Sequence, residues 1–155
     1  MSSETIVSAL FLISAVIAAG VLINSVFPII SRTTETFGSV AHSTDSQMRT
    51  DIKIVNAYAN QSSGATIWLK NVGSARIPST DLDQSDLFIG SPGDFERYSL
   101  ASHYTILESS NNFWDPGETL EITITSSKIP ATGNIAYFGI VLPNGVKRDM
   151  EFSTS

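Results

Sequence analysis

The chain has 155 residues, no cysteine, and 15 acidic against 9 basic residues, for a net charge of −6. A chain without cysteine has no disulfide framework, no thiol nucleophile and no thiolate metal site. The acidic balance argues against nucleic-acid binding, which depends on lysine and arginine neutralising phosphates.

The first predicted element is an uncharged run over residues 5–31. Nineteen of its 27 residues are Ala, Val, Ile, Leu or Phe. A helix of this length would extend about 40 Å, at about 1.5 Å per residue, whereas the hydrocarbon core of a bilayer is about 30 Å thick. We therefore predict that residues 1–31 form an apolar helix that lies in a membrane or in the core of a filament.

A cleaved signal peptide is another interpretation of this run. Such a peptide calls for basic residues before an apolar stretch of about 7–15 residues. Residues 1–4 include neither lysine nor arginine, and the apolar run is longer. We therefore expect the helix to be retained.

Small side chains gather in the middle of the run. Ser14 and Ala18, like Ala15 and Ala19, are four residues apart. This spacing lets helix backbones approach closely in an apolar medium. We predict that the helix contacts the membrane, or copies of itself, through Ile6, Leu10, Ile13, Ser14, Ala15, Ile17, Ala18 and Ala19.

A polar segment, residues 32–50, follows the run. Pro28 removes an intrahelical hydrogen bond, so we expect the helix to kink or end there. Beyond residue 31 the apolar positions are Phe37, Val40, Ala41 and Met48. Their spacing fits one face of a helix. We predict a polar stalk that is helical in part, with a flexible linker as the alternative.

The remaining residues, 51–155, form one predicted domain of alternating apolar and polar residues. Seven runs have this pattern: residues 51–60, 65–71, 86–90, 104–108, 119–125, 135–142 and 146–152. Asn144-Gly145 is the strongest hairpin signal, because both residues tolerate positive φ. Short strands, regular turns and no convincing internal helix predict an immunoglobulin-like antiparallel β-sandwich. The fold class is therefore mainly β with one long N-terminal α-helix.

The sequence carries little that predicts catalysis. Its two histidines, His42 and His103, lie in no recognisable nucleophile motif, and no glycine-rich phosphate loop occurs. Asp81, Asp83 and Asp86 alternate in a way that suits calcium, but they lack the central glycine and distal glutamate of an EF-hand. We therefore predict no enzyme, no cofactor and no small-molecule substrate, and leave calcium open.

Two features bear on which side of a membrane the domain occupies. Arg32 follows the apolar run, and the positive-inside rule would then place the domain in the cytoplasm. Asn60-Gln61-Ser62 is an N-glycosylation sequon, which favours an extracytoplasmic domain. These two features oppose each other, with the sequon leaning toward a domain outside the membrane and Asn60 as a possible glycosylation site.

Three stretches carry a family resemblance. The opening SETIVSALFLISAVIAAGVL, and the later TIWLKNVGSARIP and FWDPGETLEI, resemble the archaeal flagellar (archaellum) accessory proteins of the FlaG/FlaF type, especially FlaG. The resemblance implies a type IV pilin-like helix joined to an immunoglobulin-like domain outside the cytoplasmic membrane.

The resemblance also implies a function and partners. Such proteins help to form the stator that ties the rotary filament motor to the cell envelope through the surface-layer protein, and the two paralogous stator proteins associate. We therefore expect a non-enzymatic archaellum component in the archaeal envelope. The alternative is a filament subunit like an archaellin or a type IV pilin.

Overall fold

The computed structural model describes residues 3–62, 64–108 and 111–155. The chain forms two compact units, with residues up to His42 in the first and Ser43–Ser155 in the second. The last two turns of the long helix, from Ser43 onward, therefore belong to the unit that contains the sandwich.

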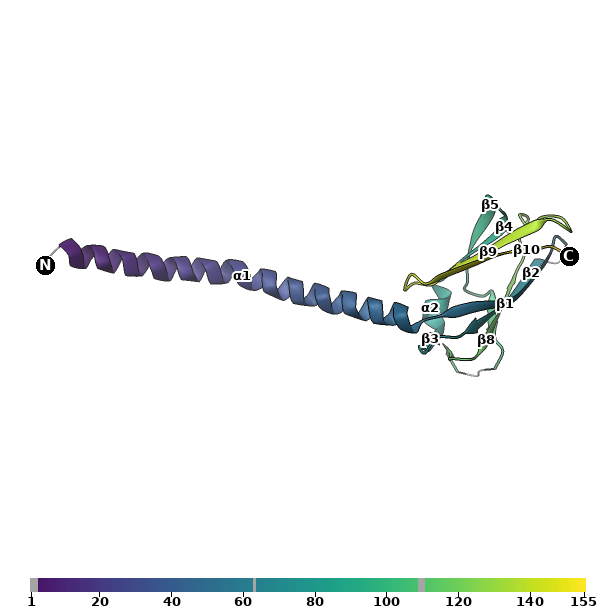
Figure 1. Ribbon diagram of the computed structural model, residues 1–155, viewed down its shortest axis with the longest axis horizontal. Helices are drawn as coiled ribbons and strands as arrows, with labels where there is room; N and C mark the ends of the chain where they lie inside the picture. Colours follow the sequence, from purple (N-terminus) through teal and green to yellow (C-terminus); the bar gives the residue numbers. More distant parts are fainter. Residues whose placement is uncertain (1–2, 63, 109–110) are drawn as a thin grey trace. The chain divides into compact units, whose positions relative to one another are not determined.

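Helix α1 is continuous from Ser3 to Arg49 (Figure 1). An end at Pro28, one of the two expected outcomes, is excluded. Ser and Thr hydroxyls of the following turns donate to carbonyls four residues earlier, as Ser31 does to Phe27 (3.1 Å) and Thr33 to Ile29 (2.7 Å). Such side-chain bonds help a helix to continue past a proline.

In its described residues, the sandwich has ten strands and one short helix. In chain order they are β1 (Ile52–Asn60), β2 (Gly64–Asn71), β3 (Ile77–Pro78), α2 (Ser79–Asp83), β4 (Asp86–Ser91), β5 (Asp94–Ser99), β6 (Tyr104–Ile106), β7 (Phe113–Trp114), β8 (Thr119–Ile124), β9 (Ile135–Val141) and β10 (Lys147–Ser153). All seven predicted strands are present. The expectation of no internal helix is wrong, because α2 occupies residues 79–83 and its Leu82 is buried.

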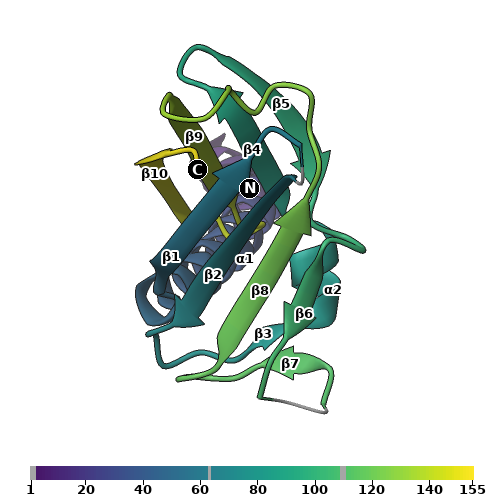
Figure 2. The same ribbon diagram turned by 90° about the vertical axis from the view of Figure 1, so that its right-hand side faces the viewer.

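Two four-stranded antiparallel sheets face each other (Figure 2). Their orders are β1-β2-β8-β6 and β10-β9-β4-β5, and a two-stranded ribbon of β3 and β7 lies at one end. In immunoglobulin terms these sheets correspond to A-B-E-D and to G-F-C with one added strand. The immunoglobulin-like sandwich predicted from the alternation is confirmed.

The core lies between the two sheets. In β8, Leu120, Ile122 and Ile124 are buried while the residues between them face outward, as the alternation predicted. Leu87 of β4 and Phe138 of β9 meet them from the opposite sheet and are fully buried. Period-two alternation thus places one apolar face of each sheet in the core.

The predicted hairpin at Asn144-Gly145 joins β9 to β10. Gly145 has a φ of 86°, whereas Asn144 is not in the left-handed region. The Gly145 amide donates to the Leu142 carbonyl, and the Leu142 amide donates to Val146, each at 2.9 Å. The connection is therefore a three-residue loop with glycine in the left-handed position, which leaves the Asn144 side chain available for other contacts.

Candidate functional site

The candidate site lies where α1 enters the sandwich, within the unit that begins at Ser43. Two loops hold the last turns of the helix: residues 71–75 after β2, and residues 142–146 between β9 and β10. The contacts of these loops with α1 are made by backbone amides and uncharged side chains. The arrangement can hold a helix in place and carry a force.

The 142–146 loop contacts the side of the helix. Gln47 Nε2 donates to the Asn144 carbonyl at 2.6 Å. The Asn144 Nδ2 donates in turn to Thr50 Oγ1 at 2.9 Å, and Thr50 Oγ1 donates to the Ser46 carbonyl at 2.8 Å. Asn144 thereby joins the hairpin to the last turn of α1.

The 71–75 loop caps the end of the helix. The last carbonyls of a helix have no intrahelical partner. Here the amides of Ser74 and Ala75 donate to the Arg49 carbonyl, at 2.9 and 3.0 Å. The amides of Val72 and Gly73 donate to the Asp51 carbonyl, both at 2.9 Å. The cap is supplied by a distant part of the chain, so it fixes tertiary structure as well as the helix end.

Asn71 organises this loop from inside the core. Its side chain is fully buried, and its Nδ2 donates to the carbonyls of Ala75 and Trp114, each at 3.0 Å. Its Oδ1 accepts the Gly73 amide at 3.1 Å. The buried amide is therefore satisfied on both sides, as a buried polar group must be to avoid a large desolvation cost.

Trp114 connects Asn71 to the start of β8. Its ring is fully buried, and its Nε1 donates to the Glu118 carbonyl at 2.9 Å. The Glu118 carboxylate accepts the Asp115 amide at 2.7 Å. The stretches TIWLKNVGSARIP and FWDPGETLEI, which carry the family resemblance, thus meet in one cluster beneath the helix end.

Arg76 and Asp115 form an ion pair on the exposed side of this cluster. The Arg76 guanidinium donates to both carboxylate oxygens of Asp115, at 2.9 and 3.2 Å, and lies 4.3 Å from the centroid of the Phe113 ring. Hydrogen bonds from Asn111 and then from Arg76 lower the pKa of Asp115. The paired carboxylate is thus held in its charged form.

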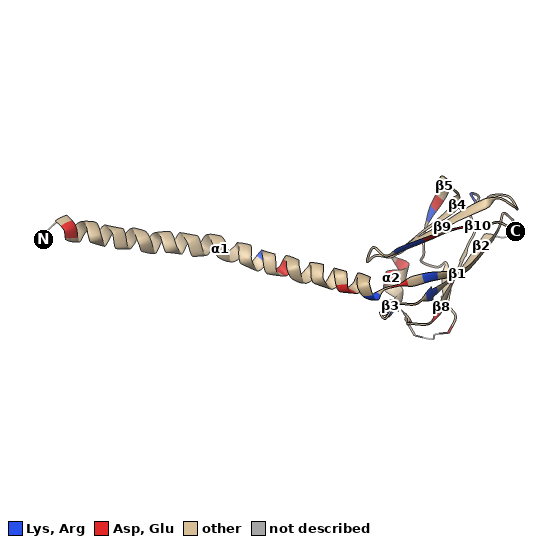
Figure 3. Ribbon diagram, in the orientation of Figure 1, with Lys and Arg blue, Asp and Glu red and all other residues tan. Residues whose placement is uncertain are grey.

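The residues predicted for membrane contact or self-assembly all lie on α1. Ile6, Leu10, Ile13, Ser14, Ala15, Ile17, Ala18 and Ala19 are exposed, as is every described residue of the helix. By length and composition α1 can cross a membrane, and its first two thirds carry almost no charge (Figure 3). The role of the eight residues stays a prediction.

The acidic residues considered for calcium are not gathered into one site. Asp86 pairs with Arg97 at 2.7 Å, and Asp83 accepts the Tyr104 hydroxyl at 3.2 Å. In the described ranges no group of three or more His, Cys, Asp or Glu residues is placed to hold a metal ion. Each of these two carboxylates has its own partner.

The predicted glycosylation site lies at the end of β1. The Asn60 Oδ1 accepts the Ser62 amide at 2.9 Å, and its Nδ2 donates to the Ser155 carbonyl at 2.7 Å. A glycan would replace only one of the two Nδ2 hydrogens, so the bond to Ser155 does not by itself exclude it. Glycosylation of Asn60 stays a prediction.

Residues 2–152 match the model of the archaeal-type flagellin family. The chain belongs to this family. A protein of Archaeoglobus fulgidus is 26% identical over 165 residues, which cover 99% of both chains. Members and structural neighbours are structural components of the archaellum, in the cell envelope or in the filament outside the cell.

Similar solved structures include two groups. The archaellum periplasmic stator protein FlaG of Sulfolobus acidocaldarius is 27% identical, with a TM-score of 0.53 over 66% of this chain and 99% of that one. A chain of the FlaF–FlaG stator complex of that organism is 25% identical, with a TM-score of 0.54 over 65% of this chain and 87% of that one. The expected FlaG/FlaF resemblance is confirmed.

The second group is a filament. The archaeal flagellum of Methanospirillum hungatei has a TM-score of 0.68 over 97% of this chain and 93% of that chain, at 16% identity. This likeness concerns the fold alone. The filament structure thus matches nearly the whole chain, whereas the FlaG structure matches about two thirds of it.

The buried cluster around Asn71 was not predicted as a site. Asn71 and Trp114 are 43 residues apart in the sequence, and neither belongs to a recognised catalytic or binding motif. The sequence held one signal for this cluster. In TIWLKNVGSARIP and in FWDPGETLEI, a predicted strand adjoins a turn, Asn71-Val72-Gly73 in the first and Asp115-Pro116-Gly117 in the second.

Proposed function

We propose that the chain is a membrane-anchored stator component of the archaellum that links the rotary filament motor to the cell envelope. The observation that carries this proposal is the likeness to FlaG, which extends over 99% of that structure at 27% identity. The filament is matched at 16% identity. The greater sequence likeness is to the stator protein.

The apolar part of α1 supplies the anchor in this proposal. Large side chains such as Phe11 and Val16 are 73% and 72% exposed in the single chain. Apolar surface on this scale is stable in lipid or against other helices but is costly in water. The small residues Ser14, Ala15, Ala18 and Ala19 then form the face where copies approach.

The site described above supplies the mechanical link. A stator must resist the reaction torque of a rotating filament, so its anchor and its envelope-binding domain cannot be joined by a slack linker. The helix end is bonded to two loops of the sandwich, through Asn144 and through the amides of Ser74 and Ala75. Force on these turns passes into both sheets through several bonds at once.

The proposed partners follow from this role. They are the membrane, copies of the chain itself through α1, a paralogous stator protein and the surface-layer protein. The FlaF–FlaG complex supports the paralogous partner, because a chain of that complex is 25% identical to this one. The sandwich then lies outside the cytoplasmic membrane.

Deletion in the native archaeon tests the stator role. Filaments should still be assembled, and the cells should swim poorly when tracked by microscopy. Normal swimming by a clean deletion strain would overturn the proposal. Loss of all filaments would instead favour a subunit role.

A pair of substitutions tests the mechanical link without removing the protein. Gln47→Ala combined with Asn144→Ala removes side-chain bonds between α1 and the hairpin. Swimming speed should fall while the amount of membrane-bound protein stays unchanged. Asn134→Ala is the matched control, because its side chain makes an exposed bond to Ala131 away from the helix.

A filament subunit is the second candidate function. The M. hungatei flagellum favours it, because that fold covers 97% of this chain and includes the helix. Shearing the cells separates the two roles. A major subunit would dominate the released filaments, whereas a stator protein would remain with the membranes.

A further inference from the structure

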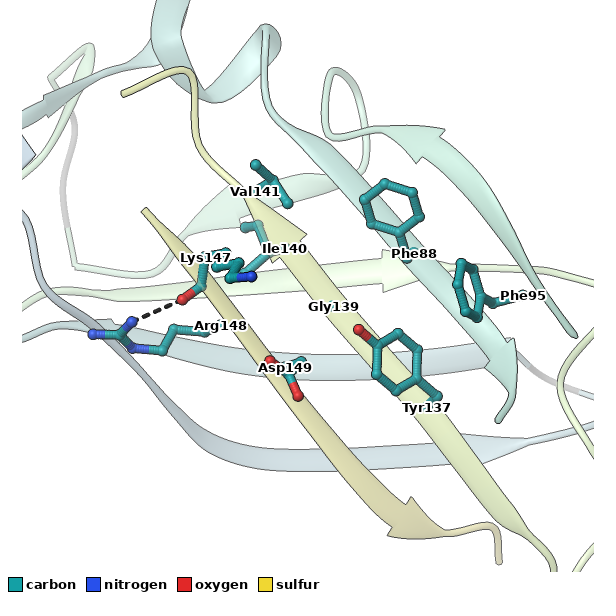
Figure 4. Close-up of a pocket in the computed structure, with 9 residues that line it drawn as sticks. All are labelled: Phe88, Phe95, Tyr137, Gly139, Ile140, Val141, Lys147, Arg148 and Asp149. Atoms are coloured by element: carbon teal, nitrogen blue, oxygen red, sulfur yellow. Dashed lines mark hydrogen bonds between the residues drawn. The ribbon is translucent and has the colours of Figure 1, made fainter. Parts of the chain in front are cut away.

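The outer face of the β10-β9-β4-β5 sheet contains a shallow hollow. Its floor is Gly139 of β9, and its walls are Phe88, Phe95, Tyr137 and Asp149 (Figure 4). The volume is about 240 Å³. Pockets for whole small-molecule ligands measure about 300–1,000 Å³, so this hollow fits one side chain better than a complete ligand.

Strand register explains why these residues meet. Gly139 pairs with Phe88 on one side and with Asp149 on the other, so the three share one face of the sheet. The Tyr137 hydroxyl is directed over Gly139 (Figure 4), and a Cβ at that position would lie 2.9 Å from its oxygen. The absence of a side chain at Gly139 therefore makes the hollow.

The aromatic residues form an exposed cluster. The Phe95 and Tyr137 rings have centroids 5.2 Å apart and are tilted by 32°, and Phe88 meets Phe95 edge to face at 5.9 Å. Phe95 is nevertheless 47% exposed. A cluster of aromatic rings left open to solvent on a folded sheet is typical of an interaction surface.

Two carboxylates border the cluster without a partner. Asp149 and Glu151 of β10 are exposed, and among the described residues neither forms an ion pair or a side-chain hydrogen bond. By contrast, Asp86 pairs with Arg97 and Asp94 with Lys128. Burial, followed by the charges of Asp149 and Glu151, raises the pKa of Tyr137. Strand register places Glu151 directly beside Tyr137, so the ring has a carboxylate as its neighbour on β10.

Two basic residues also border the hollow. The Arg148 guanidinium is directed away from it and donates to the Ile52 carbonyl at 3.0 Å and to Asp51. Lys147 pairs in register with Val141 of β9. Along β9, Val141 and Tyr137 lie on opposite sides of Gly139, so Lys147 is at the end of the hollow opposite to Tyr137. The end of the hollow at Tyr137 is thus acidic and aromatic, and Lys147 opposes cation binding from the other end.

We propose that this hollow binds an arginine side chain of a partner protein. A guanidinium stacks on aromatic faces and bonds carboxylates through parallel N–H groups, so it uses Tyr137 together with Asp149 and Glu151. Its apolar stem covers Phe88 and Phe95. A neutral ligand would use the rings and leave the carboxylates unpaired. The inference holds for a stator protein and for a filament subunit alike.

A peptide titration tests the proposal on the full chain in detergent micelles. The probe is acetyl-Gly-Arg-Gly-Arg-Gly-amide, and the control peptide carries citrulline, the uncharged isostere, in place of arginine. NMR signals of the Tyr137 and Phe95 rings should shift and saturate with the arginine peptide. Binding of the citrulline peptide should be at least about fivefold weaker, because charge-assisted bonds are lost. Equal binding of both peptides, or no shift of either ring, would overturn the proposal.

Substitutions test whether the peptide binds at this hollow or is attracted only by the net charge of the chain. Asp149→Asn with Glu151→Gln should weaken binding of the arginine peptide about fivefold or more, and Lys147→Gln should strengthen it about twofold. The matched control, Asp81→Asn with Glu35→Gln, changes the net charge equally, at residues outside the hollow. Equal weakening by the control pair would show non-specific attraction and would refute the site.

Discussion

Gly73 lies directly against Arg49, the last residue of α1. A Cβ at position 73 would collide with the Arg49 carbonyl oxygen and lie 2.5 Å from the Asp51 amide nitrogen. Because glycine has no side chain, the 71–75 loop approaches closely enough for Ser74 and Ala75 to cap the helix. The close approach of the 71–75 loop to the final turn of α1 depends on this glycine.

Gly73→Ala should therefore destabilise the sandwich. Forcing a methyl group against backbone costs about 1–3 kcal/mol of unfolding free energy. This loss is measured by urea unfolding in micelles, with tryptophan fluorescence as the signal. Trp68 and Trp114 both lie in the sandwich and report its unfolding. Gly38→Ala is the control: apart from its chain neighbours and its own helix backbone, no atom lies within 4 Å of its Cβ position. Alanine there should be neutral or stabilising by up to about 1 kcal/mol. Equal effects of the two substitutions would contradict the contact.

Asn71→Ala should cost about 2–4 kcal/mol, because it leaves the Gly73 amide and the carbonyls of Ala75 and Trp114 without their partner. The same unfolding experiment measures the loss. Asn56→Ala is the comparison, since that exposed side chain accepts a bond only from the neighbouring amide of Ala57 among the described contacts. It should change stability by about 0.5 kcal/mol or less. A small loss at position 71 would show that the buried amide is dispensable.

Acid should weaken the cluster at Asp115. Its pKa is lowered in the folded chain by Asn111 and Arg76. The stabilisation is therefore present above the ordinary pKa of an aspartate, about 3.9, and is lost as the pH falls from there through the lower folded value. Asp115→Asn should flatten the fall in stability below about pH 4, and Arg76→Gln should flatten it in part. An acid dependence identical to that of the unsubstituted chain would exclude this role.

Self-association of α1 should depend on its small residues. Ala18→Leu places a bulky group where helices are proposed to meet, so dimerisation in micelles should weaken about tenfold, the equivalent of about 1.4 kcal/mol. Energy transfer between differently labelled copies measures it. Val16→Leu, an enlargement two residues away, should have little effect. Association that is insensitive to Ala18 would place the contact on another face.

Local patterns predicted most of the sandwich. The alternation of Leu120, Ile122 and Ile124 with polar residues was sufficient for β8, because one side of that strand is buried and the other is open. Strand β5 was missed for the opposite reason: five of its six residues are exposed, as on an edge strand, so no apolar period marks it. Helix α2 is five residues long, which is too short for helical periodicity.

Apolar length and period-two alternation are local properties, so they were sufficient to predict a long apolar helix followed by a β-sandwich. The contacts of Asn71 with Trp114, of Gly73 with Arg49 and of Asn144 with Thr50 became known only from the folded chain. These contacts join residues 24 to 94 positions apart. They are selected by the need to satisfy buried amides and helix-end carbonyls, and no local pattern encodes that requirement.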